Sequence, residues 1–256
     1  MESSKGTFEH AALAWLVELG ATEAICDAPI NRYELPVVSE MLKTPRTLAS
    51  PMIATTPVDP VEVAEQAALG ARDLEELRAA LAAFDLCDLK QGARNLVFSD
   101  GIPGAKLMLI GEAPGRDEDR LGKPFVGRAG QLLDRMLAAI EYGRTQQDAP
   151  VYLTNVLPWR PPQNRDPKPQ EVAIMRPFLM RHIALAQPKV LGIVGNWSCQ
   201  ALLGKKGITR LRGQWTEAAG LPAMPMFHPA YLLRSPQFKK EAWADLLSLK
   251  ARLRTL

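Results

Sequence analysis

Residues 106–111 read KLMLIG, a short apolar run ending in glycine that is typical of a buried parallel β-strand. Three further strands of this kind are predicted downstream, over residues 151–156, 190–195 and 223–227. Helical patterns alternate with them, over residues 129–140, 170–186, 196–203 and 238–253. The alternation predicts an α/β fold, a three-layer α/β/α sandwich around a four-stranded, mainly parallel sheet.

The formal charge divides the chain in two. Residues 1–80 hold 13 acidic and 6 basic side chains, a net charge of −7, whereas residues 81–256 hold 15 acidic and 25 basic ones, a net charge of +10. We therefore expect an acidic N-terminal arm over 1–80, joined to a basic α/β domain over 81–256. A basic domain suits nucleic acid, because phosphate contacts release counterions. Enzymes without such a partner reach similar charges, so charge alone leaves both interpretations open.

The arm is expected to be helical with a linker in its middle. Residues 8–20 have the apolar spacing of a short amphipathic helix that ends in glycine, and further helical patterns lie near 60–68 and 74–84. Residues 26–60 are rich in Pro, Ser and Thr, which predicts an extended linker.

Composition argues against several classes of protein. A hydrophobic fraction of 47% is typical of a soluble globular chain, and no apolar run approaches the roughly 18 residues of a membrane span. The N-terminus lacks the basic and apolar regions of a secretion signal, so we expect a cytoplasmic protein without membrane contact. We also expect a monomer. Cys26, Cys87 and Cys199 form no CxxC pair, which argues against a disulfide framework and a four-thiolate metal site.

Parallel sheets of this kind bind ligands beyond the carboxyl ends of their strands. The loop after the first predicted strand, residues 111–130, holds five glycines and four acidic side chains. The glycines allow tight turns and close approach of the backbone to a ligand. A solvated acidic turn is the alternative interpretation.

Two further strand ends carry candidate ligand-binding side chains. Asn155 can offer both a donor and an acceptor to a base edge, although asparagine is also a common turn former. Residues 160–167 predict a stiff, basic loop after it. His228 follows the fourth strand and precedes a proline suited to the first turn of a helix; a structural histidine is the alternative.

Two segments are candidates for contact with nucleic acid. Residues 205–215 form a basic patch with Gly and Trp that favours phosphate contact over a merely solvated loop. Residues 232–234 read Leu-Leu-Arg, which would form an apolar wedge if exposed, although leucine pairs at helix starts ordinarily belong to the core. The resulting candidates are Lys205, Arg212, Leu232, Leu233 and Arg234.

Four blocks of sequence together resemble one family. They are GEAPGRDEDRLGKPFVGRAGQLL at 111–133, TNVLPWRPPQNRDPKPQE at 154–171, LRGQW at 211–215 and HPAYLLRSP at 228–236. In this order and spacing they resemble the bacterial and archaeal family-four uracil-DNA glycosylases, over roughly residues 84–250. The resemblance implies the uracil-DNA glycosylase fold and a monofunctional enzyme that flips uracil out of single- or double-stranded DNA and leaves an abasic site.

The resemblance also implies which residues bind the base. Phe125 resembles the aromatic residue that stacks on uracil in the family. Asn155 resembles the residue that forms hydrogen bonds with the Watson–Crick edge of uracil. Ala113 lies in the same block as Glu118, which is similar to a second acid that faces the base. We expect these four residues to surround the flipped uracil.

Three other residues are implied to assist bond cleavage. Glu112 is similar to an acid near the sugar that positions or activates water, His228 to a donor to uracil O2, and Asn164 to a polar residue near the scissile bond. These types suit the chemistry, because the sugar gains oxocarbenium character and the departing base gains negative charge. No lysine in the blocks serves plainly as a Schiff-base nucleophile, so we expect hydrolysis without strand cleavage.

One departure from the family concerns its cofactor. Typical members hold a [4Fe–4S] cluster with four cysteines, the first two as a CxxC pair ahead of the first strand. Here Phe84 stands for the first of that pair, Cys87 for the second, and Trp159 and Met175 for the other two. One thiolate cannot replace four, so we expect no cluster and no cofactor.

The alternatives within and beyond the family are three. A non-catalytic DNA-binding or abasic-site-binding protein could keep the fold, and a mismatch glycosylase of a sister family could keep it with a changed pocket. A relative that forms a covalent adduct with DNA uses a histidine in an Arg-rich insert, but no histidine lies between Gly195 and Trp215. Gly115 stands where another branch has a tyrosine that excludes thymine, so a wider range of deaminated bases is conceivable.

Overall fold

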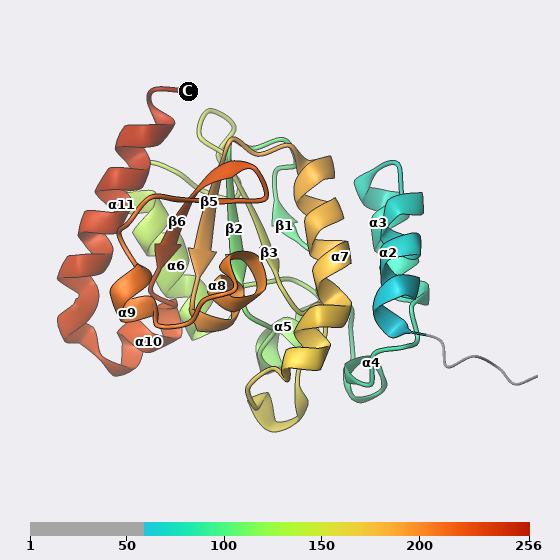
Figure 1. Ribbon diagram of the computed structural model, residues 1–256. Coiled ribbons are helices and arrows are strands. Elements are labelled where there is room, and N and C mark those ends of the chain that lie inside the picture. Colours follow the sequence, from blue (N-terminus) through green and yellow to red (C-terminus); the bar gives the residue numbers. More distant parts are fainter. Residues whose placement is uncertain (1–58) are drawn as a thin grey trace, which may run out of the picture. The chain divides into compact units, whose positions relative to one another are not determined.

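The computed structural model describes residues 59–256 of the chain (Figure 1). The predicted helix over 8–20 and nearly all of the predicted linker over 26–60 lie outside the described residues. The remaining predicted elements can be compared with the structure one by one.

A six-stranded mixed sheet forms the centre of the described part. Its strands are β1 (Asp100–Gly101), β2 (Leu107–Gly111), β3 (Val151–Asn155), β4 (Val190–Val194), β5 (Thr216–Ala218) and β6 (Leu221–Met226). Their order across the sheet is β1-β3-β2-β4-β6-β5, and the central four strands run parallel. These four are the strands predicted from apolar runs.

The expectation of four strands is wrong because a short antiparallel strand is added at each edge. β1 pairs with β3, and β5 pairs with β6. The two edge strands have the sequences DG and TEA, which are too short and too polar to show an apolar run. These two segments are strands because they pair with β3 and β6.

The side chains of the parallel strands alternate between two apolar clusters. Met108 and Ile110 of β2 belong to a cluster with residues of α7 and α8, whereas Leu107 and Leu109 belong to one with residues of α6 and α11. A period of two is that of a strand buried on both faces. Helices therefore flank both faces of the sheet, as predicted (Figure 1).

The described residues form ten helices, six of which lie within a few residues of predicted helical patterns, whereas the short helices over 89–92, 116–121 and 208–211 are not predicted. The helices are α2 (Pro60–Gly70), α3 (Leu74–Ala83), α4 (Leu89–Gly92), α5 (Arg116–Leu121), α6 (Arg128–Ala139), α7 (Pro169–Ala186), α8 (Asn196–Leu203), α9 (Ile208–Leu211), α10 (Pro229–Arg234) and α11 (Lys239–Leu253), with 3₁₀ turns η1 (Pro162–Asn164) and η2 (Pro236–Phe238). Side-chain caps start the first two: Asp59 accepts from the N–H of Val61, and Asp73 from that of Glu76.

Helices α2 and α3 pack against α7, on its side away from the sheet (Figure 1). Leu77 and Leu81 of α3 are buried in the cluster that contains α7, and the Nε of Arg181 donates to the carbonyl of Ala71 over 2.9 Å. A boundary after residue 80 therefore falls inside α3 and inside its packing. The two helices belong with the α/β unit because their apolar side chains pack against α7 and join its hydrophobic cluster.

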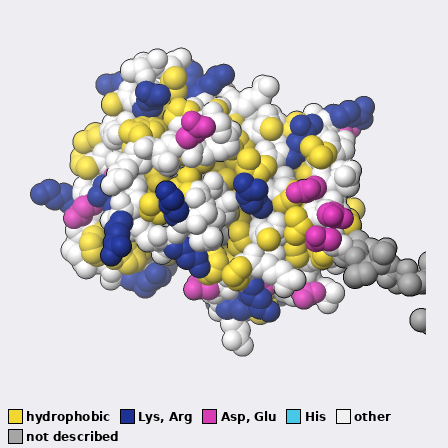
Figure 2. All heavy atoms as spheres, in the orientation of Figure 1, with side chains coloured by type: hydrophobic (Ala, Val, Ile, Leu, Met, Phe, Trp, Pro, Cys, Tyr) yellow, Lys and Arg dark blue, Asp and Glu magenta, His cyan; other side chains and the backbone are white. Residues whose placement is uncertain are grey.

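The surface carries charge of both signs. Figure 2 shows Lys and Arg side chains over much of the α/β unit, with several Asp and Glu side chains near α2 and α3. Within residues 59–256, no helix combines the length and hydrophobicity needed to cross a membrane.

Candidate active site

A pocket of about 590 Å³ opens at the carboxyl ends of the parallel strands. Its wall comes from the loops that follow β2, β3, β4 and β6. Eight predicted site residues lie in that wall, namely Glu112, Ala113, Glu118, Phe125, Asn155, Asn164, His228 and Arg234. Segments far apart in the sequence thus bring the expected base-binding and catalytic side chains around one cavity.

Gly111, the last residue of β2, brings Phe125 and Asn155 together. A Cβ at this position would lie 2.4 Å from the Cζ of Phe125 and 2.4 Å from the Oδ1 of Asn155. Only glycine lets an aromatic ring and an amide approach the strand this closely. Asn155 is 8% exposed, and no side-chain hydrogen bond among the described residues involves its amide. A stacking surface and an unused donor–acceptor pair therefore stand side by side.

The turn that carries Phe125 has a strained backbone. Phe125 has φ of 55°, in the left-handed region, which costs a bulky residue of order 1–3 kcal/mol. Hydrogen bonds hold the turn on both sides. Arg144 Nη2 donates to the carbonyl of Phe125 over 2.9 Å, and the N–H groups of Val126 and Gly127 donate to Glu118 Oε1 over 2.9 and 2.8 Å. The ring is thus fixed in the pocket wall.

Arg144 is itself held by two carboxylates. Its Nη1 donates to Asp100 Oδ2 over 2.7 Å, and its Nε donates to Asp134 Oδ1 over 3.0 Å. The side chain is mostly buried, and Nη1 also reaches the carbonyl of Pro124 over 3.2 Å. Sequence reasoning missed this residue, because a lone arginine in a turn belongs to no motif and its partners lie 10 to 44 residues away.

Glu118 lines the pocket, but its bonds are to backbone. Besides the two N–H groups of the Phe125 turn, its Oε2 accepts from the N–H of Gly115 over 3.1 Å. This carboxylate therefore ties the loop after β2 to the Phe125 turn. The resemblance implies that Glu118 also faces the base, and its side chain does line the pocket.

Glu112 lies directly after β2 and is held by the start of α8. Its Oε1 accepts from the N–H of Trp197 over 2.9 Å. Gly195, with φ of 102°, makes room, since a Cβ there would lie 2.4 Å from the same oxygen. Burial raises the pKa of Glu112, while the backbone N–H groups of Trp197 and Asn196 oppose that rise in part. The result is an oriented carboxyl group with an elevated pKa, a property common among functional carboxyl groups.

His228 caps α10 and presents a defined tautomer. Its Nδ1 accepts from the N–H of Ala230 over 3.1 Å, so the neutral ring carries its proton on Nε2. Burial, together with the positive charge of Arg234, lowers the pKa of His228 to about 4. The ring centroid lies 6.0 Å from that of Phe125, with 30° between the planes. A neutral imidazole N–H donor therefore stands beside the stacking ring.

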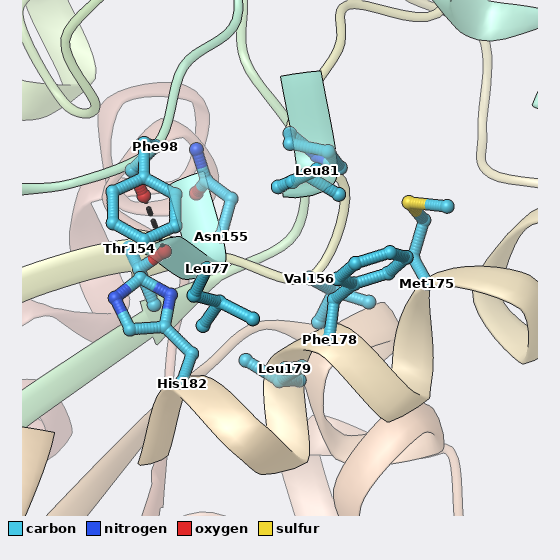
Figure 3. Close-up of a pocket in the computed structure, with 11 residues that line it drawn as sticks. Leu77, Leu81, Phe98, Thr154, Asn155, Val156, Met175, Phe178, Leu179 and His182 are labelled. Atoms are coloured by element: carbon cyan, nitrogen blue, oxygen red, sulfur yellow. Dashed lines mark hydrogen bonds between the residues drawn. The ribbon is translucent and has the colours of Figure 1, made fainter. Parts of the chain in front are cut away.

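A buried polar network lies behind Asn155 (Figure 3). Thr154 Oγ1 donates to the carbonyl of Phe98 over 2.7 Å, and the His182 ring stacks on the Phe98 ring with centroids 4.3 Å apart. The Nε2 of His182 also forms a 2.9 Å hydrogen bond with the hydroxyl of Tyr152. These contacts fix the end of β3 from its rear, and a cavity of only about 20 Å³ remains there.

Two of the eight wall residues lie at the rim. Asn164 is exposed, with φ of 54°, and its Oδ1 accepts from Arg160 Nε over 2.7 Å. Arg234 is exposed at the end of α10. Both side chains therefore line the pocket from positions exposed to solvent.

Four expected DNA-contacting residues do not line the pocket, and two of these expectations need correction. Leu232 is 1% exposed and belongs to the core, because α10 turns it inward, so only the partly exposed Leu233 is left as a wedge. Arg212 Nε donates to Asp245 Oδ2 over 2.8 Å, and this pairing engages its charge inside the protein. Lys205 is exposed, two residues ahead of Gly207 in the pocket wall.

The residues at the cluster positions form apolar packing. Phe84, Cys87, Trp159 and Met175 are all buried in the cluster that includes α7, and Phe84 packs edge-on against Phe178. Burial raises the pKa of the Cys87 thiol, which favours its protonated form. A [4Fe–4S] cluster is held by thiolates, so these side chains do not fit one. In the described part of the chain, no group of three or more His, Cys, Asp or Glu side chains is arranged to hold a metal ion.

Comparison with known proteins agrees with the fold. The profile of the uracil DNA glycosylase superfamily matches residues 98–247, more than half of the chain. The type-4 uracil-DNA glycosylase of Sulfurisphaera tokodaii is 36% identical over 186 residues, which cover 69% of this chain and 83% of that protein. Those of Archaeoglobus fulgidus and Thermotoga maritima are 39% and 40% identical over 168 and 152 residues, covering 62% and 58% of this chain and 82% and 77% of theirs. The chain belongs to the uracil-DNA glycosylase superfamily, and within it to the type-4 family.

Proposed function

We propose that this protein is a uracil-DNA glycosylase that flips uracil out of DNA and hydrolyses the N-glycosidic bond, leaving an abasic site. The observation that carries the proposal is the meeting of Phe125 and Asn155 over Gly111, in one pocket with Glu112 and His228. An aromatic face and a donor–acceptor amide are what a flipped base requires.

Base binding rests on two contacts. The ring of Phe125 stacks on uracil, and the side-chain amide of Asn155 donates to a uracil oxygen and accepts from the adjacent N–H. Both residues are fixed before the base arrives, Phe125 by its clamped turn and Asn155 by its place at the end of β3. Preorganisation of this kind reduces the cost of binding.

During bond cleavage, positive charge develops on the sugar and negative charge develops on the departing base. The Nε2–H of neutral His228 donates to the base oxygen on which negative charge grows, and Glu112 assists the oxocarbenium-like sugar and directs water to it. No lysine is among the described residues in the pocket wall. We therefore expect hydrolysis without a Schiff base, and no strand cleavage.

Substrate breadth follows from the loop after β2. Gly115 and Ala113 leave this part of the wall without a bulky side chain, so exclusion of a thymine methyl falls to Glu118 and to the fit of the pocket. Excision of hypoxanthine, xanthine or ethenocytosine would show that the enzyme accepts bases other than uracil.

The decisive experiment is incubation with single- and double-stranded oligonucleotides that contain one uracil, followed by alkaline cleavage. Cleavage at the uracil position alone is expected from the wild type. Binding without cleavage at enzyme excess would instead establish a non-catalytic DNA-binding protein. A panel with the three other deaminated or damaged bases tests the sister-family alternative.

We further propose that the protein works without an iron–sulfur cluster, its place being taken by apolar packing of Phe84, Trp159 and Met175. Protein made with ample iron and purified without oxygen should contain far less than one iron per chain and show no visible absorption band. Cys87→Ala should retain excision, because the proposed site does not use this thiol. Stoichiometric iron that is lost in Cys87→Ala would overturn the proposal.

A further inference from the structure

A second cavity, of about 570 Å³, lies beside the pocket and has no part in the chemistry above. Its wall consists of Arg94, Arg116, Asp117, Asp119, Arg120 and Arg160. Two links join it to the pocket. Arg116 follows Gly115 of the pocket wall, and Arg160 donates to Asn164 of that wall. A strand that leaves the pocket on this side therefore passes the groove.

One of the two carboxylates in the groove is used by the backbone. Asp119 is buried, and its Oδ1 accepts from the N–H groups of Arg94 and Asn95 over 2.8 and 3.3 Å. The amide of Asn95 in turn donates to the carbonyl of Asp119 over 2.7 Å. These bonds attach the segment ahead of β1 to α5, and they supply Asp119 Oδ1 with backbone donors.

The other carboxylate, Asp117, is only loosely paired. It lies 3.9 Å from both the Nε of Arg116 and the Nη2 of Arg120. These two arginine side chains are 80% and 63% exposed, and exposed pairs at such distances contribute little. The four arginines of the groove thus exceed its two aspartates by a formal charge of +2, and the ion pairs of Asp117 are long.

The chemistry of the groove matches a phosphodiester chain. Guanidinium groups present forks of donors that suit phosphate oxygens, and several like charges in one groove are relieved by a polyanion. In Figure 2, Lys and Arg side chains gather at the lower edge of the view, near α5 and the N-terminal end of α7. The loop that holds Arg160 precedes this end of α7.

We infer that the four arginines bind the phosphates next to the flipped nucleotide, on the strand that carries the uracil. The inference rests on the proposed function and adds to it the path of the substrate strand. It also gives the loop after β3 a role, since Arg160 joins the groove to the pocket through Asn164.

The first test measures binding alone. Arg116→Gln/Arg120→Gln removes two exposed charges whose only ion-pair partner is Asp117 within residues 59–256. With a labelled, undamaged single-stranded oligonucleotide, the slope of log Kd against log salt should fall by about 1.4, or about 0.7 per phosphate contact. Affinity at 0.15 M salt should fall about tenfold. Asp117→Asn should act in the opposite direction and tighten binding.

The matched control is Arg78→Gln/Arg135→Gln, which removes two exposed arginines of α3 and α6 that line neither cavity. Its salt slope should equal that of the wild type. Equal losses in both double variants would show a general charge effect and overturn the inference, as would an unchanged slope in Arg116→Gln/Arg120→Gln.

The second test locates the contact. Uracil oligonucleotides with two neutral methylphosphonates, on either the 5′ or the 3′ side of the uracil, should raise the KM of the wild type on one side only. On that side the Arg116→Gln/Arg120→Gln variant should show no further rise. A rise of equal size in wild type and variant would overturn the inference. Arginine-dependent binding by a wild type that excises nothing would instead overturn the proposed function and leave the phosphate site intact.

Discussion

Two regions of the molecule are built in different ways. One is the pocket at the carboxyl ends of the parallel strands, and the other is the layer formed by α2, α3 and α7. At these strand ends, Glu112, Glu118 and His228 are held by hydrogen bonds to backbone N–H groups. Phe125 lies there with a strained φ. In the helical layer, buried apolar side chains such as Phe84 and Met175 fill space without specific bonds.

This difference shows what each region tolerates. A packed layer accepts other apolar residues of similar volume at modest cost, so its side chains can be exchanged with little effect on the fold. A pocket with fixed donors and acceptors tolerates little change, because a displacement of about 1 Å can cost about 10²-fold in rate. The substitutions below test this contrast in order of expected effect.

Glu112→Gln should have the largest effect. The amide keeps an oxygen for the N–H of Trp197, so the fold should be unchanged, while loss of the carboxylate should lower kcat by about 10²–10⁴-fold. The wild-type rate should fall as pH falls through the raised pKa of Glu112, because its working form is ionised. The variant should lack this acidic limb. If the pH–rate profile of Glu112→Gln still fell on the acidic side, another group would have the water-directing role.

Asn155→Ala should lower kcat/KM by about 10²–10³-fold, since a preorganised donor to the base is lost. Its melting temperature should change little, as the amide has no side-chain partner in the described part of the chain. Thr154→Val is the matched comparison, because it removes the bond to Phe98 and should reduce stability by about 1 kcal/mol with a much smaller effect on rate. A reversal of these two results would make Asn155 structural.

Arg144→Lys should lower excision by about ten- to a hundredfold, because one ammonium group cannot replace the fork that holds the carbonyl of Phe125 and two carboxylates. The loss should fall mainly on KM, through weaker stacking. Asp134→Asn, which weakens one partner only, should have a smaller effect in the same direction. Wild-type KM in Arg144→Lys would show that the turn holds Phe125 without the clamp.

His182→Phe tests the helical layer and should leave excision nearly intact. Burial lowers the pKa of His182 to about 3, whereas an unfolded histidine titrates at about 6.5. The unfolded state therefore binds the proton first, and stability falls as pH drops below about 6.5 and continues to fall toward pH 3. The contribution of His182 to this loss is about 2 kcal/mol between pH 7 and pH 5, and it is measured as the difference in urea denaturation between wild type and variant. The variant should lose less over that interval.

Local patterns were sufficient for the framework of the fold. The four parallel strands, the alternating helices and the polar residues at the strand ends follow from apolar periodicity and from the rule that ligands bind at carboxyl ends. The blocks at 111–133, 154–171, 211–215 and 228–236 carried the resemblance that the comparisons bear out. Each of these signals lies within a few consecutive residues, where backbone geometry relates neighbours directly.

The tertiary structure decided whatever depends on partners distant in sequence. β1 and β5 are strands only because β3 and β6 pair with them, and Leu232 is core only because of where α10 packs. Arg212 is withdrawn from the surface by Asp245, and Arg144 reaches Phe125 across 19 residues. The groove of four arginines likewise assembles from segments at 94, 116–120 and 160. Such contacts leave no periodic trace in the sequence, because chain folding alone brings the partners together.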